Sequence, residues 1–204
     1  NILRTVATDG HRLALGSLTT TNSITEKSSI IIPRKAIMEL GRLLNDSDDN
    51  VTIAFSNQQI KVELPDLHFT SKLIDGQFPN YERVLPLGGD KEVIAERDQL
   101  KQALSRAAIL SSDKHRSVRI NLESGLLKAT VINQEQESAE EEISVEYTGA
   151  PLEIAFNNAY LLDLLNAIPE DKVKMVFSDE NSSALITPAD DKLQRQYVVM
   201  PMRL

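Results

Sequence analysis

The sequence predicts an α+β fold built from repeated units. Two segments, residues 30–45 and 152–169, each contain an apolar strand followed by a helix. Each helix is then followed by three short strands in the same order. A repeat of this kind indicates two similarly built α+β units rather than one mixed sheet.

The first copy begins with three isoleucines that precede a proline. Residues 30–32 are expected to form a strand, and Pro33 suits the first turn of a helix over residues 34–44, where an N–H has no intrahelical partner. Alternating apolar residues then predict strands over residues 51–55, 60–64 and 67–73.

The second copy follows the same plan. We expect a strand over residues 152–156 and a helix over residues 157–168, with Asn157 or Asn158 as its N-cap. The apolar side chains of this helix recur at helical spacing, which predicts one buried face. Strands are expected over residues 173–177, 184–187 and 196–202.

A proline- and glycine-containing linker at residues 86–90 separates the two units, giving domains 1–87 and 88–204. After it we expect a strand at 93–96, a helix at 98–110 with a buried stripe, and strands at 117–122, 127–132 and 141–147. The stripe comprises Leu100, Ala103, Leu104, Ala107, Ile109 and Leu110. Residues 3–8 and 12–15 resemble only the last two of those strands. We therefore expect the first unit to lack its opening helix and strand, as in a piece of a longer protein.

Composition excludes several classes of function. The chain has 204 residues, no cysteine and three scattered histidines, so disulfides, thiolate metal sites and a histidine metal site are not expected. No apolar run approaches the roughly 18 residues that span a bilayer, and the N-terminus has no basic-then-apolar secretory pattern, so we expect a soluble, intracellular protein. The formal charge of −8 argues against binding DNA through a broad basic surface.

The C-terminal segment, residues 197–204, is rich in apolar side chains. Val198, Met200 and Met202 share one side of an extended chain, and Pro201 lacks the N–H that a central strand needs. This pattern favours an edge strand that docks partner peptides, to which flexible methionines adapt readily. The alternative is a last strand that completes a core.

The sequence Thr-Asp-Gly-His-Arg at residues 8–12 places an acid, an imidazole and a guanidinium together. Asp-Gly between alternating strands is a strong signal for a tight hairpin, in which Asp9 and Gly10 are expected to take positive backbone angles. An Asp9–His11 catalytic pair, as in a hydrolase, is the alternative. No local nucleophile motif accompanies that pair, so His11 and Arg12 are better candidates for binding.

Charged residues gather in two other places. Glutamates at 135, 137, 140, 141, 142 and 146 predict either a solvated strand edge or an acidic edge that attracts another subunit. Basic residues lie on the first two predicted helices, where they are either ordinary solvated charges or phosphate-facing groups.

Three motifs resemble the family of bacterial DNA polymerase III beta subunits, the sliding clamps. They are the sequences of residues 8–13, residues 78–86 and residues 197–204. The resemblance extends along essentially the whole chain and implies an α+β fold of repeated DNA-clamp domains, with helices on one face of antiparallel sheets. It also implies a cytoplasmic protein. Residues 1–87 then correspond to an N-terminally truncated middle domain, and residues 88–204 to a complete C-terminal domain.

The resemblance also implies a function without catalysis or cofactor. Two subunits of the family close head to tail into a ring around duplex DNA. Polymerases, the clamp loader and repair proteins insert a short linear motif with glutamine and bulky apolar residues into a pocket. Because the family's first domain is absent, the 204-residue chain by itself is expected to be monomeric.

Site residues carried over from the family fall into three groups. The peptide-binding group comprises Thr8, Gly10, His11, Arg12, Leu13, Pro79, Arg83, Val84, Asn157, Tyr160, Ser183, Val198, Val199, Met200, Pro201, Met202, Arg203 and Leu204. The DNA-facing group comprises Arg34, Lys35, Arg42, Lys101 and Arg106. The subunit-interface group comprises Ile109, Leu110, Glu135 and Glu141.

Overall fold

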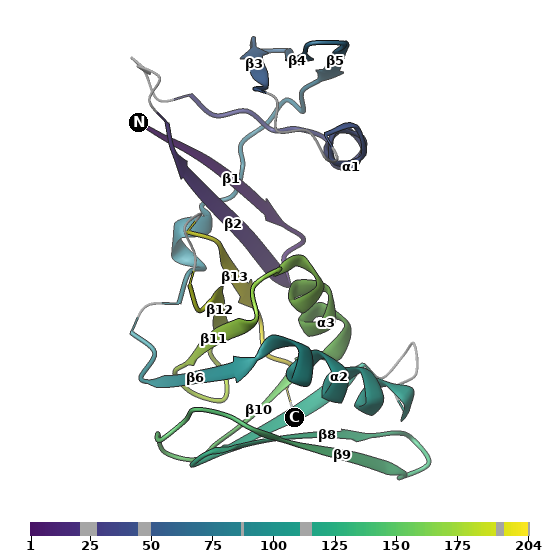
Figure 1. The fold of residues 1–204 in the computed structure, drawn as a ribbon, viewed down its shortest axis with the longest axis vertical. Coiled ribbons are helices and arrows are strands. Elements are labelled where there is room, and N and C mark those ends of the chain that lie inside the picture. Colours follow the sequence, from purple (N-terminus) through teal and green to yellow (C-terminus); the bar gives the residue numbers. More distant parts are fainter. Residues whose placement is uncertain (21–27, 45–49, 87, 111–115, 191–193, 204) are drawn as a thin grey trace. The chain divides into compact units, whose positions relative to one another are not determined.

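The computed structural model describes residues 1–20, 28–44, 50–86, 88–110, 116–190 and 194–203. The chain divides into two compact units (Figure 1). Residues 1–22 and 81–204 form the large unit, and residues 23–80 form the small unit. None of the described helices is long and apolar enough to cross a membrane.

A six-stranded sheet joins the two ends of the chain within the large unit. Its order is β1-β2-β13-β12-β11-β6, and every neighbouring pair is antiparallel. The strands are β1 (Ile2–Thr8), β2 (Arg12–Thr19), β6 (Lys91–Glu96), β11 (Lys172–Phe177), β12 (Ala184–Pro188) and β13 (Gln196–Val199). The N-terminal hairpin is therefore continuous with strands from the C-terminal half of the sequence.

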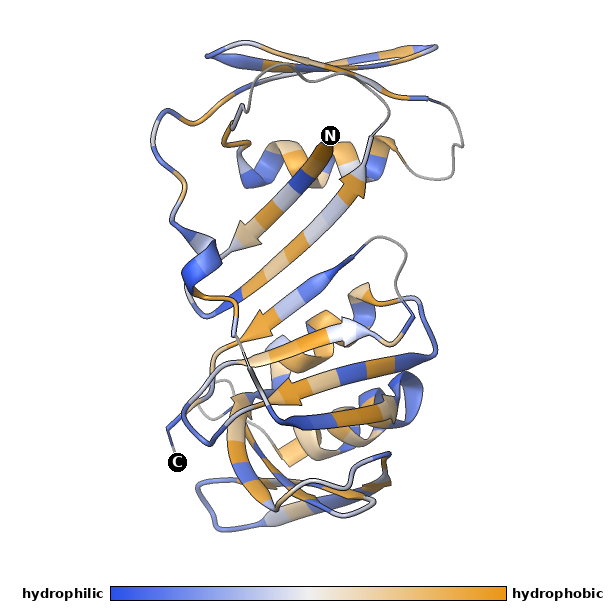
Figure 2. Cartoon of the chain, turned by 90° about the vertical axis from the view of Figure 1, so that its left-hand side faces the viewer, coloured by the Kyte–Doolittle hydropathy of each residue, from blue (hydrophilic) through white to orange (hydrophobic). Residues whose placement is uncertain are grey.

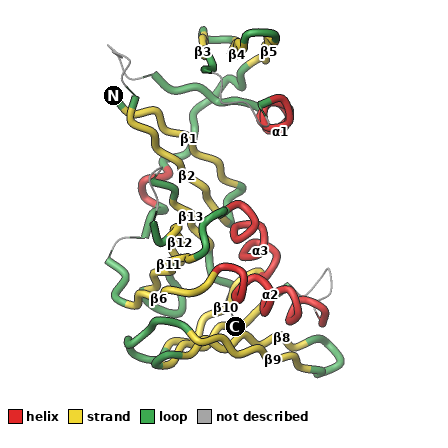
Figure 3. Tube along the Cα trace, viewed as in Figure 1, coloured by secondary structure: helices red, strands yellow, loops and turns green. Residues whose placement is uncertain are grey.

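A four-stranded antiparallel sheet and two helices complete the large unit. The sheet has the order β10-β7-β8-β9, from strands β7 (Ser117–Glu123), β8 (Leu126–Ile132), β9 (Ser138–Ser144) and β10 (Leu152–Asn157). Helices α2 (Arg97–Ala107) and α3 (Asn158–Ala167) lie behind the six-stranded sheet in Figure 2 and side by side in Figure 3. The predicted arrangement, with helices on one face of antiparallel sheets, is confirmed.

The main core lies between these layers. Side chains from both sheets meet Leu100, Ala103, Leu104 and Ala107 of α2, each at most 3% exposed. The predicted stripe is correct for these four residues and wrong for Ile109, which is 80% exposed. The α-helix ends at Ala107, and the chain tightens into a 3₁₀ turn, η2 (Ala108–Leu110). The changed winding turns Ile109 out of the stripe.

Helix α3 begins as the sequence predicts. Asn157 is the N-cap, and its side-chain oxygen accepts a hydrogen bond from the Ala159 N–H at 3.0 Å. Asn158 is buried and donates from Nδ2 to the Leu104 carbonyl at 2.9 Å, which ties α3 to α2.

Strand β9 lies earlier in the chain than the predicted range 141–147. Residues 145 and 146 no longer pair with β8. Instead, the Val145 N–H donates to the Gly125 carbonyl and the Glu146 N–H donates to the Ile94 carbonyl. These bonds carry the chain from the four-stranded sheet to β6 of the other sheet.

The C-terminal strand is central, so the prediction of an edge strand is wrong. β13 pairs with β12 on one side and with β2 on the other. Val198 and Val199 are each 1% exposed, as the alternative of a core-completing strand requires. The strand stops at Val199, before Pro201, whose missing N–H is then not needed by the sheet. Met200 and Met202 beyond it are partly exposed, at 37% and 38%.

The small unit is one helix and one antiparallel sheet of order β3-β4-β5. Its elements are α1 (Arg34–Leu43), β3 (Thr52–Phe55), β4 (Gln59–Leu64) and β5 (Leu67–Lys72). Leu40 packs with Ile60 and Val62 to form the core of this unit. The strand predicted at residues 30–32 is absent, although the Ile31 carbonyl accepts a hydrogen bond from the Ile74 N–H at 2.9 Å. Pro33 immediately precedes the helix, one position before its predicted place.

Candidate functional site

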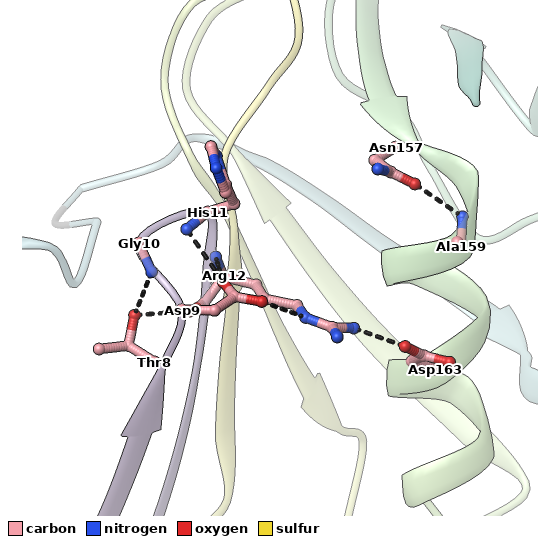
Figure 4. Close-up of polar contacts among 8 residues, drawn as sticks. All are labelled: Thr8, Asp9, Gly10, His11, Arg12, Asn157, Ala159 and Asp163. Carbon is pink, nitrogen blue, oxygen red and sulfur yellow. Dashed lines mark hydrogen bonds and ion pairs between the residues drawn. The ribbon is translucent and has the colours of Figure 1, made fainter. Parts of the chain in front are cut away.

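The turn between β1 and β2 forms the predicted hairpin. The Thr8 hydroxyl donates to the Arg12 carbonyl at 2.7 Å and accepts from the Gly10 N–H at 3.1 Å. Gly10 has a φ of +88°, which favours glycine. Asp9 is not among the described residues with positive φ, so that part of the prediction is wrong. Its side chain caps the turn instead (Figure 4).

The Asp9 carboxylate holds the turn together rather than forming a catalytic pair. Its Oδ1 accepts from the main-chain N–H groups of His11 and Arg12, at 3.0 and 3.1 Å, and its Oδ2 accepts from Arg12 Nε at 3.0 Å. Partial burial acts to raise the pKa of Asp9, but these hydrogen bonds outweigh it and lower that pKa. The His11 ring makes no hydrogen bond with this carboxylate.

Arg12 reaches from the turn to helix α3. Its Nη1 donates to Asp163 Oδ2 at 2.7 Å, and its guanidinium lies 4.3 Å from the centre of the Tyr160 ring. Burial opposes the charge of Arg12, yet the bonds to Asp163 and Asp9 raise its pKa above the ordinary value. The His11 ring is also stacked toward Tyr160, with ring centroids 6.3 Å apart and planes inclined by 26°.

The end of the chain passes beside the same turn. The Met200 N–H donates to the His11 carbonyl at 3.0 Å, and the Met202 N–H donates to the Ala155 carbonyl at 2.8 Å. The segment after β13 is thereby held between the hairpin turn and β10. Its two methionine side chains remain partly exposed.

A small apolar cluster lies under this region on the second face of the six-stranded sheet. Leu13, Leu15 and Val198 form its buried part, with Val84 packed against them. Val199 instead joins the main core, because consecutive strand residues point to opposite faces. Leu13 and Val198 are therefore buried, whereas the polar side chains of Asp9 in the turn and Asp163 in α3 are exposed.

Most of the predicted peptide-binding residues belong to the large unit. The turn, Val84, Asn157, Tyr160 and the segment 198–202 all belong to the large unit, as do Arg83, which is exposed in η1 (Tyr81–Arg83), Ser183, which precedes β12, and the exposed Arg203. Pro79 belongs to the small unit, and Leu204 lies outside the described residues.

Asp163 was missed by the sequence analysis. A signal was available, because residues three apart on a helix share a face, and Asp163 follows Tyr160 at that spacing. Its partner Arg12 lies far away in the sequence, so no local pattern predicts the ion pair.

The predicted DNA-facing residues differ in their partners. On α1, Arg34 and Lys35 are exposed and make no ion pair with another described residue, whereas Arg42 pairs with Glu39. On α2, Arg106 binds Glu141 through two hydrogen bonds of 2.8 and 2.6 Å, and Lys101 is half-buried.

The residues predicted for a subunit interface lie in η2 after α2, in the loop before β9 and in β9 itself. Ile109 is exposed, Leu110 is partly buried against the main core, and Glu135 is exposed. Glu141 belongs to β9, the edge strand of its sheet, and its partner is Arg106. One residue predicted to face DNA, Arg106, is thus paired with one residue predicted for the interface, Glu141. Within the described ranges, no group of three His, Cys, Asp or Glu side chains could hold a metal.

Comparison with known proteins identifies the family to which this chain belongs. The family model described as "DNA polymerase III beta subunit, central domain" matches residues 1–80, and the corresponding C-terminal domain matches residues 82–203. The chain belongs to the DNA polymerase III beta subunit family.

Its relatives are named beta sliding clamps. The protein from Pseudomonas aeruginosa is 52% identical over 202 residues, and that from Escherichia coli is 48% identical over 202 residues. Each match covers 99% of this chain but 55% of the relative, so the chain spans about half the length of these proteins.

Solved structures give the same result. The DNA polymerase III subunit beta from P. aeruginosa matches with a TM-score of 0.96 at 52% identity, over 100% of this chain and 55% of that one. A sliding clamp from Bartonella birtlesii bound to griselimycin matches with a TM-score of 0.94 at 41% identity, over 100% and 55%. The resemblance and the fold class predicted from the sequence are confirmed.

Proposed function

We propose that this chain forms part of a sliding clamp that encircles duplex DNA as a head-to-tail dimeric ring. Residues 1–87 are the later part of a middle clamp domain, and residues 88–204 are the C-terminal domain. The observation that carries this proposal is the pair of family matches, which follow each other in order along nearly the whole chain.

In this role the protein is a non-catalytic tether in the cytoplasm. Encirclement retains DNA by topology, so a net-acidic protein needs only a locally basic inner wall with sequence-independent phosphate contacts. The full ring is a homodimer closed through Ile109, Leu110, Glu135 and Glu141, opposite a domain that these 204 residues do not include. The 204-residue polypeptide alone is therefore expected to be monomeric.

Polymerases, the clamp loader and repair proteins bind through a short linear motif at the site formed by the hairpin turn, α3 and the C-terminal segment. Support comes from the hydrogen bonds that hold Met200 and Met202 beside this turn while their side chains stay partly exposed. Adaptable thioethers next to a fixed set of polar groups suit a site that accepts related peptides from several partners.

A short linear motif with two large apolar side chains is expected to bind weakly. Burying a leucine and a phenylalanine of the ligand contributes on the order of 1.5–3 kcal/mol each, before the costs of association. Val198 and Leu13 are already buried, so the gain depends on a rim formed by Met200 and Met202, which are exposed, and by Tyr160, which is half-buried.

Fluorescence anisotropy with a labelled peptide that carries one glutamine and two bulky apolar residues tests this assignment. Deleting residues 200–204 from the 204-residue chain should abolish or strongly weaken binding while circular dichroism shows that the variant is folded. Met200→Ala should weaken binding, whereas Met38→Ala, at an exposed methionine of the small unit, should not. Equal affinity for the intact chain and the deletion variant would contradict the proposed site.

A further inference from the structure

Asp163 is the one acidic side chain of α3 that contacts the hairpin turn. It lies one turn after Tyr160, so both side chains point from the same face of the helix toward Arg12. The Asp163 carboxylate accepts from Arg12 Nη1 at 2.7 Å while the guanidinium stays 4.3 Å from the Tyr160 ring. Figure 4 shows this bridge between two segments far apart in the sequence.

Arg12 is therefore held from three directions. Asp9 binds its Nε, Asp163 binds its Nη1, and its Cζ lies over the Tyr160 ring. Nη2 makes no hydrogen bond with any described residue, so its N–H groups remain available to an acceptor. Because the Arg12 side chain is already held in place, it loses less conformational entropy when a ligand acceptor binds.

Two carboxylates also cancel the charge that Arg12 would otherwise present. The formal charge of Arg12, Asp9 and Asp163 together is negative, because one guanidinium faces two carboxylates. A ligand carboxylate approaching Nη2 would be repelled by both acids, whereas a carbonyl or carboxamide oxygen would not. The arrangement therefore favours neutral acceptors.

We propose that Asp163 is a positioning and selectivity residue of the peptide site. It fixes Arg12 across Tyr160 and, with Asp9, neutralises it, so that the site prefers peptides with a carboxamide over peptides with a carboxylate at the position that meets Arg12. This inference rests on the proposed peptide-binding function. The side chains of Arg12 and Asp163 are 35% and 62% exposed, so the expected effects are about two- to fivefold in affinity.

Two labelled peptides test the proposal, one with a glutamine and two bulky apolar residues and one with glutamate in place of the glutamine. Asp163→Asn keeps a hydrogen-bond acceptor but removes the charge, so it should leave the glutamine peptide near its original affinity and strengthen the glutamate peptide about two- to fivefold. Asp163→Ala removes both functions, so it should also weaken the glutamine peptide. Asp171→Asn is the matched control, because it removes the same charge from an exposed side chain of the same unit.

A double-mutant cycle tests whether Asp163 acts through Arg12. In an Arg12→Ala background, Asp163→Ala should no longer weaken the glutamine peptide. The NMR signal of Arg12 Nε–H, detectable when the side chain is held, should broaden or weaken in Asp163→Ala but not in Asp171→Asn.

Three outcomes would overturn the proposal: additive losses in the cycle, equal losses for both peptides in both Asp163 variants, or Asp163 variants that match the Asp171 control. If the unaltered chain binds neither peptide, the peptide site itself is refuted. The two failures are therefore distinguishable.

Discussion

The two copies of the repeat share a sequence pattern but not an environment. In β11 of the large unit, Val173, Met175 and Phe177 are at most 5% exposed. Their counterparts around β3 of the small unit, Val51, Ile53 and Phe55, are 38%, 51% and 50% exposed. The same alternation thus specifies a strand in both places but a buried face in only one.

The difference arises from what lies beside each strand. β11 pairs with β12 and β6, and it packs in a core that also contains α2 and α3. β3 pairs only with β4 among the described strands, and the core of its unit contains one helix. An apolar face is buried only where a second layer supplies partner side chains.

The largest expected effect comes from truncating the matched phenylalanines. Phe177→Ala should destabilise the large unit by about 3–5 kcal/mol, because it empties a filled core, whereas Phe55→Ala should cost the small unit much less. Hydrogen exchange resolved by mass spectrometry reports on each unit separately. Similar losses of protection in the two variants would show that Phe55 is buried in solution and would remove the contrast.

The basic helices offer a second comparison, which depends on the proposed DNA role. In the complete ring, Arg34→Ala with Lys35→Ala should flatten the dependence of log affinity on log salt by about 0.9 for each lost phosphate contact. Arg106→Ala should have a smaller effect, because Glu141 already neutralises that guanidinium. Binding of duplex DNA at several salt concentrations measures both, and a loss limited to particular DNA sequences would argue against phosphate contacts.

The helix starts differ as well. Asn157 caps α3 with its side chain, whereas the residue before α1, Pro33, makes no side-chain cap bond. Asn157→Ala should therefore lower the free energy of unfolding by about 1 kcal/mol. Pro33→Ala removes no capping hydrogen bond, so it should lower that free energy less. Urea unfolding of the variants checks the difference.

Asn157→Asp separates structure from binding, since it retains the capping oxygen but loses the amide donor. If this variant keeps stability and loses peptide affinity, Asn157 also contacts the ligand. If both Asn157 variants lose peptide affinity only in proportion to their stability, the residue serves α3 alone.

Local patterns predicted the elements but not their long-range neighbours. The hairpin, the N-cap of α3 and the buried stripe of α2 follow from turn chemistry, capping and helical period, all read within a few residues. The central position of β13 does not, because it depends on pairing Val198 with Leu13 from the other end of the chain. The Arg12–Asp163 ion pair escaped for the same reason.

The site itself was predicted through resemblance to a family rather than through the chemistry of its residues. Asp-Gly-His-Arg read locally suggests a turn and leaves a catalytic pair open. Only the structure shows that the Asp9 carboxylate is occupied by main-chain N–H groups and by Arg12. The exposure of Ile109 could not be predicted either, because no feature of the sequence marks the change from α-helix to 3₁₀ turn after Ala107.

The smallest expected effect concerns pH and compares Asp9 of the large unit with Glu39 of the small one. In both, hydrogen bonds with an arginine lower the pKa of the carboxyl group; at Asp9 partial burial opposes them and main-chain N–H groups reinforce them. Because the folded-state pKa of Asp9 lies below its unfolded value of about 3.9, its contribution is fully present above that pH. The contribution is lost as the pH falls through the folded-state pKa.

Asp9→Asn should therefore reduce stability near neutral pH, and its difference from the unaltered chain should vanish toward the acid end of a urea series from pH 6 to pH 2.5. The Asp9 side chain is 46% exposed, so solvent screening keeps this contribution below about 1 kcal/mol. Glu39→Gln should show the same sign and a smaller change, since Glu39 is bound only by the exposed Arg42. A stability difference for Asp9→Asn that persists unchanged to pH 2.5 would mean that the carboxylate charge does not hold the turn.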